Sequence, residues 1–220
     1  EKLFKNVLLG LPGSDERFTP EKMLELLNAY QGIDDDALRK NLVHFLSEVA
    51  PVAEELGVKL AIHPDDPPFS VLGLPRVVST EKDIEYILSA VPENTNGLCY
   101  CTGSLGARPN NDLVRVIDQH GDRIHFLHLR NVKREDGKRF RESEHLKGDN
   151  PMEEIIEKLL LLMNKNNIAL PMRPDHGFLH SFEGKEKYPG YSLIGRLKGL
   201  AEIRGLELGI CYKLNQQKQA

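Results

Sequence analysis

The sequence lacks any apolar run long enough to cross a bilayer as a helix, since no window approaches ~18 uninterrupted apolar residues. Residues 1–13 also lack the long apolar stretch of a secretory signal peptide. The three cysteines cannot all pair with one another, and a C-x-C pair on a strand rarely has disulfide geometry. We therefore expect reduced thiols, a cytoplasmic location and no membrane partner.

Concentrated positive charge is missing as well. The net charge is −4, and the densest basic run, residues 133–139 (KREDGKR), also contains acidic residues. Segments that bind a phosphate backbone usually contain basic residues without interspersed acidic ones and extend over a larger surface. We therefore interpret this run as a solvated loop and expect no nucleic-acid partner. A chain of 220 residues is long enough for one sizeable core, and we expect a single domain, 1–220.

The hydrophobic pattern alternates between helical periodicity and short apolar runs. Amphipathic spacing predicts helices at residues 20–30, 34–56, 80–91, 110–120 and 152–165. Short apolar runs predict strands at residues 58–64, 97–102, 123–132 and 168–177. Strands separated by helices pair in parallel, because a parallel pair needs a crossover and a helix is the usual one. The sequence therefore predicts an α/β fold.

Polar residues at the carboxyl ends of four strands suit either a doubly wound sheet or part of a TIM barrel. No G-x-G-x-x-G follows a strand and no G-x-x-x-x-G-K-[ST] occurs, which weakens the nucleotide-binding version of the open sheet. We therefore expect a (β/α)8 TIM barrel. Four strands are too few for eight, so either the fold is smaller than a full barrel or its amino-terminal strands lie outside this sequence. We favour the second explanation and expect this chain to carry the carboxy-terminal strands and helices.

Each predicted strand delivers one potential metal ligand near its carboxyl end. The four are His63 in AIHPDDPP, Cys101 in CYCTGS, His128 in FLHLRN and Asp175 in MRPDHG. Imidazole, thiolate and carboxylate together favour Mn, Fe, Co or Zn over Ca or Mg. A single histidine or cysteine on an apolar strand is more often packed in the core, but four separate strands present such a residue at the same edge. The sequence therefore predicts a metal site.

Two neighbouring residues compete for these positions. His125 and His128 are three residues apart on one strand, so their side chains face opposite sides, and His128 lies nearer the carboxyl end. Cys99 shares a face with Cys101 but lies further from that end. We expect Cys99 to pack in the core.

Several longer stretches resemble the mannonate dehydratase family. They are AIHPDDPP, GLPRVVST, CTGSLGARPNND, HLRNVKRE, MRPDHG and PGYSLIGRLKGLAEIRG, and the match covers nearly the whole chain. This family belongs to the xylose-isomerase-like TIM barrels, and the resemblance implies a catalytic Mn2+ or Fe2+ ion. The implied ligands are His63, Cys101, His128 and Asp175. Family members are longer at the amino end, so contacts from their earlier strands fall outside this sequence.

The resemblance also implies a hydro-lyase reaction. Members of the family remove water from D-mannonate, a small sugar acid, to give 2-keto-3-deoxy-D-gluconate in hexuronate (glucuronate) breakdown. We expect such an enzyme to be a homo-oligomer, a dimer.

Three further side chains near the inferred metal are candidates for catalysis. We assign proton transfer to Tyr191 and His176, with the choice of general base open, because a nearby cation can draw the pKa of a tyrosine down from about 10. Arg173 either clamps the substrate carboxylate through its planar fork or forms a surface ion pair.

Loop residues after the strands supply weaker candidates. Asp65 and Asp66 either bind sugar hydroxyls, support His63 or shape a turn. Four more polar residues follow strands and are candidates for lining the pocket: Ser104, Arg108, Lys133 and His145.

Two other functions are compatible with the same residues. A sugar isomerase or epimerase on the same metal barrel uses similar enolate chemistry, and fold analogy does not separate the two. Typical isomerases of this superfamily favour carboxylate ligands, so the Cys101 thiolate favours the dehydratase. The remaining alternatives are a sugar-acid binding protein without catalytic activity and a truncated barrel too incomplete to catalyse the reaction.

Overall fold

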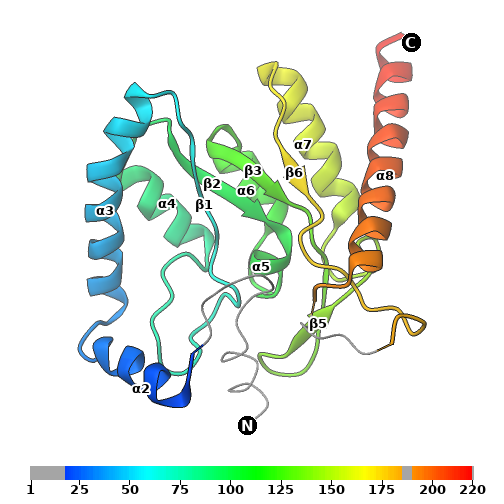
Figure 1. Ribbon diagram of the computed structural model, residues 1–220. Coiled ribbons are helices and arrows are strands. Elements are labelled where there is room, and N and C mark those ends of the chain that lie inside the picture. Colours follow the sequence, from blue (N-terminus) through cyan, green and yellow to red (C-terminus); the bar gives the residue numbers. More distant parts are fainter. Residues whose placement is uncertain (1–17, 185–189, 220) are drawn as a thin grey trace.

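A computed structural model describes residues 18–184 and 190–219 of the chain (Figure 1). Residues 1–17, which include the segment without a signal-peptide pattern, lie outside the described residues. The helices are α2 (Pro20–Ala29), α3 (Asp35–Glu55), α4 (Glu81–Ala90), α5 (Thr102–Gly106), α6 (Leu113–His120), the 3-10 turn η1 (Gly121–Arg123), α7 (Met152–Asn166) and α8 (Leu193–Gln219). The strands are β1 (Leu60–Ile62), β2 (Asn96–Cys101), β3 (Ile124–His128), β4 (Val132–Arg134), β5 (Phe140–Glu142) and β6 (Met172–Arg173). None of the helices in the described ranges is long and apolar enough to cross a membrane.

The main sheet has four parallel strands in the order β1-β2-β3-β6. Their order in space follows their order in the chain, so the sheet contains no point at which the strand order reverses. A doubly wound sheet has such a reversal, whereas a TIM barrel adds each new strand on the same side of the last one. The predicted parallel α/β fold with four strands is therefore confirmed, and its strand order is that of a barrel segment.

Capping residues explain where several helices begin. Thr80 and Asp83 form a capping box at the start of α4, in which each side chain accepts a hydrogen bond from the backbone N–H of the other. The Asp34 side chain accepts from Ala37 N at 2.8 Å at the start of α3. These caps lie at the predicted starts, and the five predicted helices are confirmed to within three residues at each end.

Two groups of buried apolar side chains join the helices to the sheet. The larger group packs α6, α7 and α8 against β2 and β3 through residues such as Leu98, Tyr100, Ile155 and Ile203. The smaller group packs α3 and α4 near β1, around Ala50 and other residues. Figure 1 shows the result, with α3 and α4 at one end of the sheet and α7 and α8 at the other.

The chain leaves the sheet earlier than predicted after the third strand. β3 ends at His128, and residues 132–134 form β4, which pairs antiparallel with β5. The turn happens at Asn131, whose side-chain oxygen accepts from the backbone N–H groups of Val132 and Asn150. The segment 133–139, interpreted as a loop, is thus partly strand and partly the hairpin turn. This hairpin lies beyond the carboxyl ends of the parallel strands (Figure 1).

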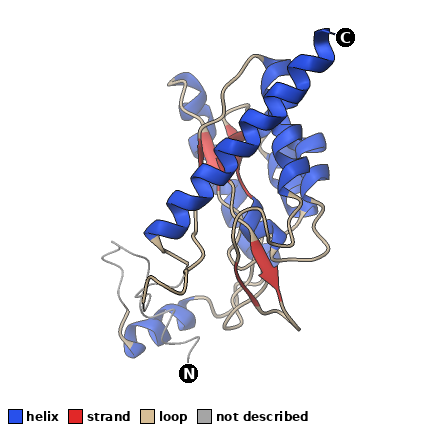
Figure 2. Cartoon of the chain, turned by 90° about the vertical axis from the view of Figure 1, so that its right-hand side faces the viewer, coloured by secondary structure: helices blue, strands red, loops and turns tan. Residues whose placement is uncertain are grey.

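The long helix α8 was not predicted, and its two apolar sides explain why. Ile203 and Ile210 are buried against the core, while Leu197 and Leu208 are 58% and 57% exposed on another side. A helix that is apolar on both sides lacks the single stripe by which amphipathic helices are recognised. Figure 2, viewed from the α8 side, shows this helix running across the molecule to the C-terminal end.

Two glycines of α8 provide a matched test of its packing. A Cβ added at Gly199 would lie 2.1 Å from the buried His145 ring, whereas one added at Gly205 would meet nothing within 4 Å. Gly199→Ala should therefore lower the free energy of unfolding by about 1–3 kcal/mol through overpacking. Gly205→Ala should raise it by about 0.5–1 kcal/mol, because alanine favours the helix. Urea denaturation measures both, and equal effects would contradict the position of α8.

Candidate metal centre

Four side chains meet at the carboxyl edge of the sheet. His63 follows β1, Cys101 ends β2, His128 ends β3 and Asp175 follows β6. Each offers one ligand atom, and these four atoms all lie within 4.8 Å of one another. His63 Nε2 lies 3.1 Å from His128 Nδ1, and Cys101 Sγ lies 3.7 Å from Asp175 Oδ2. The structure thus brings together all four residues that the sequence analysis selected as ligands.

The spacing of these atoms fits a single divalent ion. Two nitrogens bound at ~2.1 Å and at right angles lie ~3.0 Å apart, and ligands on opposite sides lie about 4.2–4.6 Å apart. The observed 3.1 Å matches the right-angle spacing, and the 4.8 Å limit lies slightly above the spacing of opposite ligands. His63 Nδ1 lies 2.6 Å from the Pro64 carbonyl oxygen, which can only accept, so Nδ1 carries the proton. The lone pair of His63 Nε2 is therefore directed at the other ligands.

Burial shifts the pKa values of two of the ligands, Cys101 and His128. Burial, followed by the charge of Asp175, raises the pKa of the Cys101 thiol to about 12, although Arg130 and hydrogen bonds from Ser104 oppose this shift. Burial also lowers the pKa of His128 to about 4, so this imidazole is neutral near pH 7 and keeps a lone pair. A cation acts against the first effect, because a coordinating thiol loses its proton. The cluster is therefore a donor set that a cation would complete.

Asp175 is buried, and one contact holds its carboxylate while another holds the backbone just before it. Its backbone is left-handed, with φ of 60°, and its Oδ1 accepts from Arg173 Nη2 at 2.7 Å. Burial works to raise the pKa of Asp175, but the nearby positive groups outweigh it and the pKa is lowered. The buried His145 lies 2.8 Å through Nε2 from the Pro174 carbonyl, one residue before Asp175. His145 thus supports the Asp175 backbone and was expected instead to line the pocket.

The three catalytic candidates lie beside this cluster. His176 Nε2 is 4.0 Å from Asp175 Oδ2, and the His176 ring lies 4.6 Å from the Tyr191 ring. Burial and the charge of Asp175 raise the pKa of Tyr191, while Arg130 and Arg173 act to lower it. The expected lowering of the Tyr191 pKa depends on a cation and stays a prediction. The Arg173 side chain is 47% exposed and forms an ion pair with the buried Asp175.

The competing residues lie elsewhere. The register between β2 and β3 shifts after Leu98, so His125 has no paired residue on β2. The Nδ1 atom of His125 lies 2.6 Å from the Leu60 carbonyl oxygen. Cys99 is 5% exposed, and its pKa is raised to about 12, first by burial. Neither residue belongs to the cluster of four.

The loop after β1 is held by its own aspartates. Asp65 accepts hydrogen bonds from Val78 N at 2.7 Å and from Ser79 Oγ at 2.9 Å, so it shapes this loop. Asp66 pairs instead with the buried Arg130.

Of the weaker pocket candidates, one contacts the ligand cluster and the others contact the surrounding loops. Ser104 Oγ donates to Cys101 Sγ at 3.2 Å and so touches the cluster. Arg108 donates to the Pro68 carbonyl, and Lys133 pairs with Asp149. Sequence reasoning missed two charged residues here, Arg130 and Glu142, because their contacts join separate segments of the chain and no local spacing signals them.

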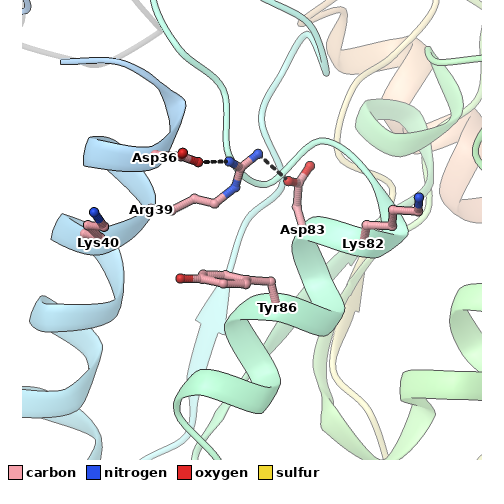
Figure 3. A pocket seen from close by; sticks show the side chains of 6 residues that line it. All are labelled: Asp36, Arg39, Lys40, Lys82, Asp83 and Tyr86. Carbon is pink, nitrogen blue, oxygen red and sulfur yellow. Dashed lines mark hydrogen bonds and ion pairs between the residues drawn. The ribbon is translucent and has the colours of Figure 1, made fainter. Parts of the chain in front are cut away.

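A hollow away from the ligand cluster lies between α3 and α4, with a volume of about 410 Å³ (Figure 3). Arg39 spans it and pairs with Asp36 at 3.0 Å and with Asp83 at 3.2 Å. Asp83 also belongs to the capping box of α4. Because two carboxylates compensate the Arg39 charge, we interpret this hollow as a packing feature where Arg39 connects α3 with α4, and not as a ligand site.

Fold and site together define a class: an α/β protein with a parallel sheet in barrel order and a candidate metal centre at the carboxyl edge of the strands. A family model described as D-mannonate dehydratase (UxuA) matches residues 1–218 of the chain. The chain belongs to this family.

Individual relatives agree with the family match. A mannonate dehydratase of Marinomonas sp. (strain MWYL1) is 50% identical over 218 residues, which cover 96% of this chain and 56% of that protein. One of Saccharophagus degradans is 48% identical over 212 residues, covering 93% and 53%. The crystal structure of mannonate dehydratase from Streptococcus suis serotype 2 matches with a TM-score of 0.78 and 33% identity, over 92% of this chain and 57% of that one. The chain thus spans about half the length of the relatives it matches.

Proposed function

We propose that this chain carries the metal centre of a mannonate dehydratase, a hydro-lyase that converts D-mannonate to 2-keto-3-deoxy-D-gluconate in hexuronate catabolism. The convergence of four ligand atoms within 4.8 Å carries the proposal, and membership of the family supplies the substrate. The proposed ion is Mn2+ or Fe2+, held by His63, Cys101, His128 and Asp175, because this mixed donor set suits transition metals.

We propose a domain organisation, an oligomeric state and a location together with this activity. The single domain, 1–220, would be the carboxy-terminal part of one (β/α) barrel, in keeping with the barrel order of its strands. We also propose a cytoplasmic homodimer acting on a small sugar acid.

Dehydration requires that a proton leave the carbon beside the carboxylate and that a neighbouring hydroxyl depart as water. A divalent ion in the cluster would act as a Lewis acid and stabilise the negative charge that develops when this proton leaves. His176 and Tyr191 would handle the two protons: one group removes the proton from carbon, and the other protonates the departing hydroxyl. Arg173 has further N–H groups beyond the one that donates to Asp175, and these would bind the substrate carboxylate.

The direct test is an assay of the chain with D-mannonate and Mn2+ under reducing conditions, with 2-keto acid as the readout. We expect keto acid to form, and removal of the ion by a chelator should abolish its formation. An isomerised sugar in place of keto acid would favour an isomerase. Binding of mannonate by the metal-loaded chain without any product would contradict the dehydratase proposal and favour a binding protein.

Replacing Tyr191 by phenylalanine tests its proposed part in proton transfer. The change removes only the hydroxyl, so kcat for keto acid formation should fall by about 10²–10⁴-fold, the usual contribution of general acid–base catalysis. Tyr86→Phe is the matched control, because Tyr86 is 47% exposed on α4. Steady-state kinetics of both variants measure the effect. Equal kcat values for Tyr191→Phe and the unmodified chain would remove Tyr191 from the mechanism.

A further inference from the structure

A buried arginine after β3 connects the loop that follows β1 with strand β5 of the hairpin. The Arg130 side chain is 3% exposed and follows β3 in the chain. Its Nε and Nη2 donate to the two carboxylate oxygens of Glu142 at 2.9 and 2.6 Å, and its Nη1 donates to Asp66. This paired geometry is the one in which a guanidinium holds a carboxylate most rigidly.

The position of Arg130 is itself fixed by its surroundings. Thr102 Oγ1 accepts from Arg130 N at 2.9 Å and lies 2.6 Å from the Arg130 carbonyl oxygen. The side chain runs over Gly103, where an added Cβ would lie 2.2 Å from Arg130 Cδ. The guanidinium therefore has little freedom to move, and neither has the carboxylate that it holds.

Glu142 contacts His176 with the same oxygen that Arg130 Nη2 reaches. Glu142 Oε1 lies 2.9 Å from His176 Nδ1, and the opposite ring atom, Nε2, points toward Asp175 at 4.0 Å. Burial works to raise the pKa of Glu142, but hydrogen bonds from His176 and Arg130 outweigh it and the pKa is lowered. An ionised carboxylate only accepts hydrogen bonds, so the proton of this contact sits on His176 Nδ1.

We propose that Glu142, held by Arg130, is the positioning residue for His176: it fixes the ring orientation and the Nδ1–H tautomer. The lone pair of Nε2 then faces the ligand cluster, ready to exchange a proton with the substrate. Only this last step rests on the proposed function. The hydrogen bond made by one ring nitrogen decides what the other can do. An imidazole without such an acceptor favours the Nε2–H form in water, which would direct a proton at the cluster in place of a lone pair.

The tautomer is measured directly by 15N NMR of the chain labelled in its histidine rings, without metal or substrate. We expect the Nδ1–H form for His176 in the unmodified chain. In Glu142→Gln the amide can donate to Nδ1, so the signal should move to the Nε2–H form or to a mixture. Glu142→Asp keeps the charge and should restore Nδ1–H. Glu135→Gln, which alters an exposed carboxylate of the same hairpin paired with Arg141, should leave the signal unchanged.

Kinetics supply the second readout. Glu142→Gln should lower kcat by about 10–100-fold, the usual effect of changing a group that orients a functional residue, with KM for mannonate nearly unchanged. An Nε2–H form in the unmodified chain would overturn the proposal, even if Glu142→Gln failed to fold. An unchanged Nδ1–H signal in a folded Glu142→Gln would overturn it too. Absence of keto acid formation alongside an Nδ1–H ring would refute the proposed function and leave the positioning role standing.

Discussion

Replacing Cys101 by serine should abolish metal binding and dehydration while leaving the fold intact. The thiol is buried among the other three donors and lies 3.7 Å from Asp175 Oδ2, so the substitution changes one atom of the cluster. A serine hydroxyl is a far weaker ligand than a thiolate for a transition ion. We expect the affinity for Mn2+ or Fe2+ to fall by at least about a hundredfold. This loss should exceed the one caused by changing a residue that only hydrogen-bonds to a metal ligand. Metal analysis after dialysis, with circular dichroism for the fold, measures both.

Cys99→Ser is the matched control for this experiment. Cys99 lies two residues earlier on β2 and is also buried, but it is not part of the cluster. This variant should keep its metal and its activity, even if the buried hydroxyl lowers stability slightly. Full metal content in Cys101→Ser, or loss of metal in Cys99→Ser alone, would show that the ligand has been assigned to the wrong cysteine.

Replacing Arg130 by methionine should cause the largest loss of stability. Methionine keeps much of the apolar stem but removes the charge that compensates Asp66 and Glu142. Breaking a buried ion pair by removing one partner costs about 3–5 kcal/mol, because the remaining charge stays buried without compensation. Total stabilities are commonly only about 5–15 kcal/mol, so the variant should unfold at a much lower urea concentration. Equilibrium denaturation at pH 7 measures the difference.

Two controls separate this effect from a general loss of charge. Arg141→Met removes an exposed arginine that pairs with Glu135, and such pairs contribute less than about 1 kcal/mol. The pH supplies the second control. The folded-state pKa of Glu142 lies below its ordinary 4.5, so its stabilising contribution is present above pH 4.5 and is lost as the pH falls through the folded-state value. The gap between the unmodified chain and Arg130→Met should therefore shrink in acid. A stability difference that stays constant as the pH falls would contradict its assignment to the Arg130–Glu142 ion pair.

The sheet and the ligand cluster were predictable from the sequence for a physical reason. Short apolar runs that follow amphipathic helices must pair in parallel, and their carboxyl ends then meet at one edge. His63, Cys101 and His128 each lie at such an end, so a list of strand ends already brings them together. Asp175, whose own backbone is left-handed, completes the set from the loop after β6.

The supporting residues could not be predicted in the same way. Arg130 contacts Asp66 across 64 residues and Glu142 across 12, and Glu142 lies on a hairpin that the pattern did not indicate. Such contacts depend on where loops cross above the sheet, and neither hydrophobic period nor ligand spacing encodes that. Asp66 was expected to bind sugar hydroxyls, support His63 or shape a turn, but it forms one end of the ion network around the buried Arg130.

The central claim is that one cation lies among four donors from four strand ends. Crystals grown with Mn2+ and measured for anomalous scattering test it most directly. We predict one strong peak about 2.0–2.5 Å from His63 Nε2, Cys101 Sγ, His128 Nδ1 and an Asp175 carboxylate oxygen. A fully occupied manganese ion elsewhere, or four side chains pointing apart with no peak between them, would contradict the claim.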